Sequence, residues 1–178
     1  MILIPHIQRG IKVVKIFIAH SSEDEWLIKT IASNLKLIPV DPYLAKLEDP
    51  TPYPLPQKID NAIETSQAVF VFWTSNVANN QKTRDIVNWE ISAAYHKKPR
   101  KPIYVFAEKG VPVPMMMDYI TVYATYDPLN QETLNEMVKK VQQLGSAFKE
   151  SEDKAKAAFT MIACVFGLVL FGALASGK

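Results

Sequence analysis

The carboxylate of Glu90 lies in a sequence pattern that could support catalysis. It belongs to the stretch TRDIVNWEISAAY, residues 83–95, which predicts a helix. Val87, Ile91 and Ala94 recur at the spacing of a helix face that packs on a sheet, and Glu90 lies on or beside that face. Burial of an unpaired charge is costly, so desolvation would raise the pKa of this carboxyl and suit it to charge-sensitive chemistry. The alternative is a glutamate at the rim of the face, paired with a nearby lysine or arginine.

The start of this helix is expected at Thr83 or Asp85, because either side chain can accept a hydrogen bond from a free backbone N–H group of the first turn. Ile86 is expected on the buried face with the other apolar residues of the helix.

Five apolar, β-prone runs alternate with helical patterns along the chain. This alternation predicts a parallel sheet with helices on both faces. Ligands of such sheets bind beyond the carboxyl ends of the strands. The expected strands are 12–18, 40–45, 68–73, 103–106 and 120–124. Three other helices are expected. The first begins at Ser21 or Ser22 and turns Trp26, Leu27, Ile31 and Leu35 inward. The other two span 57–64 and 129–148.

The composition excludes several classes of function. The 178 residues suit one domain with an appendage. The net charge of +2, without a basic stripe that carries aromatic residues, gives no reason to expect nucleic-acid binding. The single cysteine, Cys164, rules out an intramolecular disulfide, and the three scattered histidines disfavour a zinc site. The chain has no GxGxxG, Walker or GxSxG motif.

The segment from Ala157 to Ser176 holds twenty residues without a charge, which is the length of a membrane-spanning helix. Lys149, Lys154 and Lys156 precede this span, and the positive-inside tendency therefore predicts a single-pass protein whose N-terminal domain is cytoplasmic. Small residues spaced by four within the span allow close helix packing in lipid. The expected partners are thus the lipid bilayer and, through the span, a second copy of the chain.

A proline-rich segment, residues 47–57, follows the second expected strand. Prolines at alternate positions forbid both a helix and a central strand. The segment is either a stiff connection or a loop that covers a pocket or contacts a partner.

Three motifs in order resemble the prokaryotic Toll/interleukin-1 receptor (TIR) domain family. They are KIFIAHSSEDEW, LPQKIDNAIETSQAVFVFWTSN and IVNWEISAAYHKKPRKPIYVF, and the likeness covers residues 12–145. It implies a flavodoxin-like five-stranded fold. The expected organisation is a leader at 1–11, a TIR domain at 12–148, a charged linker at 149–156 and a transmembrane helix at 157–176. The sequence departs from the family's motifs at Ala19, where the family often has serine, and at Ile86, where the family often has tryptophan.

Many TIR domains cleave NAD+ at the nicotinamide–ribose bond, and the family's catalytic glutamate corresponds to Glu90. A carboxylate beneath the ribose can stabilise the positive charge left when nicotinamide departs. NAD+ would then be a substrate, and no cofactor is expected. The candidate substrate-binding residues lie at strand ends or beside Glu90, although each also has a structural explanation as a cap, turn or core residue. They are His20, Ser21, Lys46, Trp73, Asn76 and Trp89.

The resemblance leaves several functions open. The first is an NAD+ hydrolase or cyclase that is activated by self-assembly of its TIR domains, in antiphage defence or cell-death signalling. The second is a non-catalytic module that recruits other TIR proteins to the membrane. A tail that perturbs the bilayer, and a deoxyribosyltransferase-like enzyme, are more distant alternatives.

Overall fold

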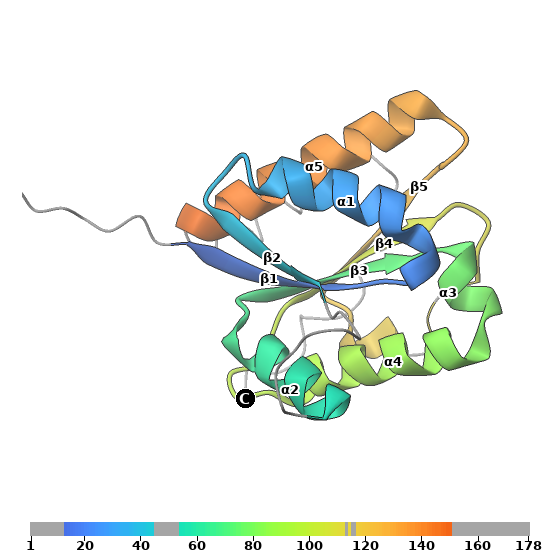
Figure 1. Ribbon diagram of the computed structural model, residues 1–178. Coiled ribbons are helices and arrows are strands. Elements are labelled where there is room, and N and C mark those ends of the chain that lie inside the picture. Colours follow the sequence, from blue (N-terminus) through green and yellow to red (C-terminus); the bar gives the residue numbers. More distant parts are fainter. Residues whose placement is uncertain (1–12, 45–53, 113, 115–116, 151–178) are drawn as a thin grey trace, which may run out of the picture.

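The computed structural model describes residues 13–44, 54–112, 114 and 117–150. Its centre is a parallel sheet of five strands in the order β2-β1-β3-β4-β5 (Figure 1). This arrangement confirms the predicted parallel sheet. The strands are β1 (Val14–Ala19), β2 (Val40–Leu44), β3 (Ala68–Trp73), β4 (Ile103–Glu108) and β5 (Val122–Tyr126).

Helices cover both faces of the sheet, as the alternation predicts (Figure 1). One face carries η1 (Ser22–Asp24), α1 (Glu25–Leu35) and α5 (Gln131–Glu150). The other face carries α2 (Leu55–Thr65), α3 (Ser75–Asn79), α4 (Gln81–His96) and η2 (Met117–Tyr119).

The core has two layers because the central strand is buried on both sides. All six residues of β3 are buried, as expected of a strand covered by helices on each face. Phe70 and Phe72 point toward α1 and α5, whereas Val69 and Trp73 point toward α2, α3 and α4. The alternation of side chains along a strand therefore decides which helix each one meets.

Gly145 allows α5 to approach α1 and β2 closely. A Cβ atom at this position would lie 3.1 Å from the side chain of Leu35 and 3.3 Å from that of Val40.

The structure corrects two predictions about which side chains are buried. Trp26 is 59% exposed, because the inward stripe of α1 consists of Leu27, Ile28 and Ile31, and Trp26 lies outside it. Ile86 is 40% exposed, because the face of α4 against the sheet is centred on Val87 and Ile91.

Several predicted boundaries also differ. The helix α4 begins at Gln81, and Asn80 caps it by accepting a hydrogen bond from the N–H of Thr83. The predicted caps, Thr83 and Asp85, therefore lie inside the helix. The short helix α3 was not predicted, and β5 begins two residues later than expected.

The edge strand β2 contains a proline. The N–H of Val14 in β1 donates to the carbonyl of Pro39, just before β2. The backbone polar groups of the odd-numbered residues of β2 therefore face β1, and those of the even-numbered residues face away from it. The backbone nitrogen of Pro42 therefore faces the outer edge of the sheet, with which no described strand pairs.

No helix among the described residues is long and apolar enough to cross a membrane. The predicted span at 157–176 and the leader at 1–11 lie outside the described residues, as does most of the linker at 149–156.

Candidate active site

Glu90 lies in the middle of α4 on the side that faces the sheet. Its exposed fraction is 4%, and its Oε2 atom has no hydrogen-bond partner among the described residues. Burial raises the pKa of this carboxyl to about 8, because desolvation penalises the charged form. Among the described residues, Glu90 is therefore not the glutamate of the alternative interpretation, which would lie at the rim of the helix face and pair with a lysine or arginine.

Glu90 lines a cavity of about 300 Å³ next to the carboxyl end of β1. The walls come from three parts of the chain: the end of β1 with its following turn, the first turns of α2, and α4 with its cap. This position agrees with the rule for parallel sheets, whose ligands bind beyond the ends of the strands. The lining residues are Ile18, His20, Ser22, Glu23, Leu55, Ile59, Asn80, Lys82, Thr83, Ile86 and Glu90.

His20 provides a second titratable group in the same cavity. Its Nδ1 atom lies 3.1 Å from the carbonyl oxygen of Ile18. A carbonyl oxygen can only accept, so Nδ1 carries the proton and Nε2 holds a lone pair in the neutral ring. Burial lowers the pKa of His20, and the hydrogen bond to the Ile18 carbonyl and the carboxylates of Asp24 and Glu25 only partly oppose this shift. The imidazole is therefore an uncharged acceptor at neutral pH.

A buried carboxylate, Asp24, ties two turns at this end of the sheet together. The hydroxyl of Thr74 donates to its Oδ2 atom at 2.5 Å, and the side-chain amide of Asn76 donates to its Oδ1 atom at 2.6 Å. Asp24 belongs to η1, after β1, whereas Thr74 and Asn76 follow β3. These bonds fix the turn that carries His20 relative to the segment that leads into α4.

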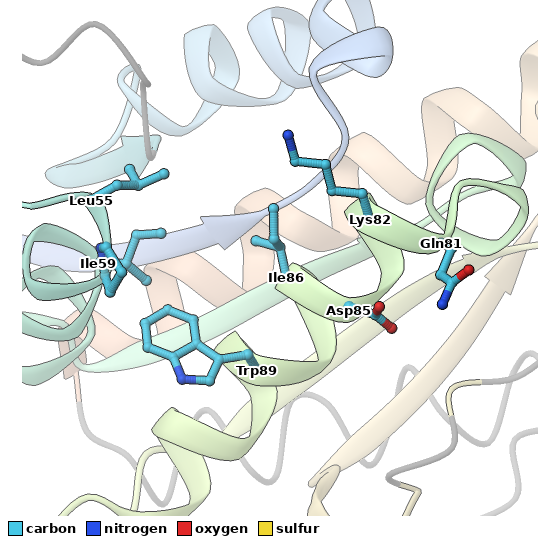
Figure 2. A pocket seen from close by; sticks show the side chains of 8 residues that line it. Leu55, Ile59, Gln81, Lys82, Asp85, Ile86 and Trp89 are labelled. Carbon is cyan, nitrogen blue, oxygen red and sulfur yellow. The ribbon is translucent and has the colours of Figure 1, made fainter.

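A larger groove lies between α2 and α4, beside the cavity (Figure 2). Its volume is about 750 Å³. Its surface is mostly apolar, with polar groups from the first turns of α4. The lining residues are Leu55, Pro56, Ile59, Gln81, Lys82, Asp85, Ile86 and Trp89. Four of them, Leu55, Ile59, Lys82 and Ile86, also line the Glu90 cavity, so the two spaces adjoin.

Two of the six candidate substrate-binding residues face these spaces. His20 lines the cavity with Glu90, and Trp89 lines the groove with its indole 40% exposed. Lys46 lies outside the described residues.

The other three candidates have structural hydrogen bonds. Ser21 accepts from the N–H of Glu23 and caps η1. The indole N–H of Trp73, a side chain only 2% exposed, donates to the carbonyl of Pro112 at 2.7 Å. Asn76 donates to Asp24. Each of these side chains supports the fold around the site.

Sequence reasoning missed the apolar wall from α2 and the cation Lys82. A signal for Lys82 is present, because Lys82, Ile86 and Glu90 are spaced by four and follow one stripe of the helix. The wall from α2 has no such signal, since Leu55 and Ile59 meet α4 only through the tertiary fold.

A family model described as "TIR domain" matches residues 16–138, which is more than half of the chain. The chain belongs to the TIR domain family. The matched region of this TIR domain runs from within β1 into the first half of α5 and therefore includes all the described residues that line the cavity and the groove.

No curated protein matches this TIR protein. Among solved structures, a prokaryotic SEFIR domain is 13% identical, with a TM-score of 0.49, and the match covers 73% of this chain and 96% of that one. The flavoenzyme FerB of Paracoccus denitrificans, an NAD(P)H:acceptor oxidoreductase, is 12% identical, with a TM-score of 0.41, and the match covers 80% of this chain and 97% of that one. Both likenesses are too distant to indicate a function.

Proposed function

We propose that this TIR protein cleaves NAD+ at the nicotinamide–ribose bond, as a glycohydrolase or an ADP-ribosyl cyclase, with Glu90 as the catalytic carboxylate. The observation that carries the proposal is the carboxyl of Glu90, which is buried, has an unpartnered oxygen and lines a cavity at the end of β1. Carboxyls with strongly shifted pKa values in a cavity are characteristic of functional sites.

The chemistry requires one carboxylate rather than two. The bond between the ribose C1′ atom and the nicotinamide nitrogen breaks, and nicotinamide leaves as a neutral molecule with the electron pair. No acid is needed to protonate this leaving group, unlike the alcohol that leaves an ordinary glycoside. The ribose acquires positive charge, which the Glu90 carboxylate stabilises. Water then adds to C1′ and loses a proton, or a nitrogen of the adenine adds instead and closes a ring.

The charge state of Glu90 is coupled to substrate binding. With a pKa of about 8, the carboxyl is mostly protonated at neutral pH in the empty cavity. The positive nicotinamide ring favours the ionised form, so binding of NAD+ at pH 7 releases a proton. The anion then forms beside the cation in a site shielded from water, where their attraction is stronger than in bulk solvent.

The test is release of nicotinamide from NAD+ by the full chain in detergent or membranes, concentrated to favour assembly. We expect release by the wild type and its loss, by at least about a hundredfold, in Glu90→Gln and Glu90→Ala. Because the carboxylate is the active form, kcat/KM should rise about tenfold per pH unit below pH 8 and level off above it. Unchanged release by both variants would overturn the assignment of Glu90.

TIR domains commonly associate with one another, and we propose that assembly switches this activity on. We also propose that the segment 157–176 holds the chain in a bilayer with the TIR domain in the cytoplasm, where the local concentration favours pairing. A role in antiphage defence or cell-death signalling follows from the resemblance to prokaryotic TIR proteins.

A non-catalytic recruitment module is the second candidate. It is favoured by the low exposure of Glu90, only 4%, which restricts access to the carboxyl from solvent. Absence of nicotinamide release from wild-type protein clustered on membranes, together with retained binding to other TIR domains in a pull-down, would support this function.

A further inference from the structure

We propose that the groove between α2 and α4 binds the adenosine half of the dinucleotide, with the adenine base against the indole of Trp89 and the diphosphate beside Lys82. The inference rests on the proposed function for its substrate and adds a second subsite to it. The proposal concerns a surface formed by residues 55–59 and 81–89.

Size is the first argument. The Glu90 cavity, at about 300 Å³, lies at the lower end of the range for small-molecule pockets, which is about 300–1,000 Å³. It can accept the nicotinamide riboside part, but a dinucleotide is about twice as large. The groove adds about 750 Å³ and shares four lining residues with the cavity. The remainder of the substrate thus has an adjoining space to enter.

The surface chemistry of the groove suits an aromatic base. Trp89 is 40% exposed and Ile86 is also 40% exposed, although both lie on a helix that buries its neighbours Val87 and Ile91. Figure 2 shows the indole of Trp89 on the α4 side of the groove, with Leu55 and Ile59 of α2 on the other. A flat base between an indole and aliphatic side chains would cover this surface, and stacking on tryptophan is available to every base.

Charge is the third argument. Lys82 borders both the cavity and the groove, so a ligand that occupies both spaces would pass close to its side chain. A diphosphate links the two halves of a dinucleotide. The ammonium group of Lys82 extends away from the carboxylate of Asp85 (Figure 2), and it forms no ion pair within the part of the chain that the structure describes. An anionic ligand would supply its partner.

The first experiment measures binding without turnover. The chain has three tryptophans, so fluorotryptophan-labelled full chain in detergent gives three fluorine signals, which Trp→Phe variants assign. We expect adenosine monophosphate to shift the signal of Trp89 and to leave that of Trp73 unchanged, because Trp73 is buried. The signal of Trp26, which is 59% exposed on α1, serves as the control. No shift at Trp89, or equal shifts at Trp89 and Trp26, would overturn the proposal.

The second experiment separates the two halves of the substrate. Nicotinamide mononucleotide contains the same scissile bond as NAD+ but lacks the adenylate. Trp89→Ala should lower kcat/KM for NAD+ about tenfold more than it lowers kcat/KM for the mononucleotide. Trp26→Ala is the matched control and should change neither. Equal losses for both substrates in Trp89→Ala would overturn the adenosine assignment.

Failure of this inference is distinguishable from failure of the proposed function. If the chain releases nicotinamide through Glu90 but adenosine monophosphate leaves Trp89 unaffected, only the second subsite is wrong. If nicotinamide release is absent, the fluorine signals still decide whether the groove binds an adenine nucleotide. A Trp89 signal that responds to protein concentration and not to the nucleotide would assign the groove to contacts between copies of the chain.

Discussion

Two titratable side chains, Glu90 and His20, share one cavity, and burial shifts their pKa values in opposite directions. The pKa of the carboxyl rises and that of the imidazole falls, because desolvation disfavours whichever form is charged. Both groups are therefore mostly neutral at pH 7. The cavity provides a hydrogen-bond donor at Glu90 and an acceptor at His20 until a cationic ligand enters and favours the carboxylate.

The raised pKa of Glu90 predicts a pH-dependent cost in stability. In the unfolded chain the carboxyl ionises near pH 4.5, and in the folded protein it ionises near pH 8. Unfolding between these values releases a proton, so the free energy of unfolding falls as the pH rises. Relative to Glu90→Gln, the wild type should lose roughly 2.5 kcal/mol between pH 5 and pH 7.

Denaturant unfolding of both proteins at pH 5, 6 and 7 measures this difference. His20 is present in both, so its own titration largely cancels in the comparison. Parallel pH profiles for wild type and Glu90→Gln would show that the folded-state pKa of Glu90 is not raised.

At the scale of single residues, the sequence predicts the identity of the key carboxylate better than its partners. The spacing of Val87, Ile91 and Ala94 indicates correctly that Glu90 is on the sheet side of its helix. The role of Asp24 could not be predicted, because its partners Thr74 and Asn76 are about fifty residues away along the chain. Only the pairing of β1 with β3 brings them together.

At the scale of elements, the Asp24 hydrogen bonds join the turn after β1, which lines the Glu90 cavity, to the segment that follows β3. Asp24→Ala removes two charge-assisted hydrogen bonds and leaves the buried hydroxyl of Thr74 without its acceptor. We expect a loss of about 3 kcal/mol in the free energy of unfolding. Chemical denaturation measures it, with the exposed Asp41 as the control: Asp41→Ala should cost less than about 0.5 kcal/mol. Equal effects at both positions would refute the role of Asp24.

A second contact joins α2 to the end of α4. Lys97, whose side chain is 14% exposed, contacts Asp60 at 2.7 Å and Glu64 at 3.1 Å. Both carboxylates are about half exposed, and solvent weakens the pair accordingly. Lys97→Ala should lower stability by about 1 kcal/mol.

The exposed pair of Lys29 with Glu25 on α1 is the matched comparison, because both side chains are about two-thirds exposed. Lys29→Ala should change the unfolding free energy by less than about 0.5 kcal/mol. A larger effect at Lys29 than at Lys97 would contradict the expected influence of burial.

The sequence predicts long apolar elements well and short polar ones poorly. The predicted bounds of β3 agree with the structure, because AVFVFW is continuous, apolar and β-prone. The helix α3 has five residues and reads as a turn, since asparagine and serine are common in both. Asn80, which caps α4, directly follows α3 and was not recognised as a cap. The predicted start of α4 therefore lies later in the sequence than the observed start at Gln81.

At the scale of the whole molecule, parallel strands place the turns after β1 and β3 at one edge of the sheet, beside the start of α4. The order β2-β1-β3-β4-β5 agrees with the flavodoxin-like topology that the TIR resemblance implies. The relative position of α2 and α4 could not be predicted, because it depends on packing that the local pattern does not encode.

The proposed membrane anchor gives a prediction for the intact chain. The full chain should sediment with membranes and remain there in alkaline carbonate, whereas a chain that ends at Glu150 should stay in the supernatant. The described fold ends at that residue, so the shortened chain should unfold at a similar temperature. A full chain that alkaline carbonate releases would contradict the proposed span.

Pro42 has a consequence for how copies of this chain can join. An edge strand normally offers a row of N–H donors that a strand from another molecule can pair with. In β2 the proline removes a donor from the outward-facing row, and the exposed Asp41 adds a charge beside it. Extension of the sheet from one molecule to the next, the route by which many proteins form fibres, is therefore obstructed at β2. An ordered assembly that uses this side of the molecule must rely on side chains of helices and loops, which allows it to be reversible and specific.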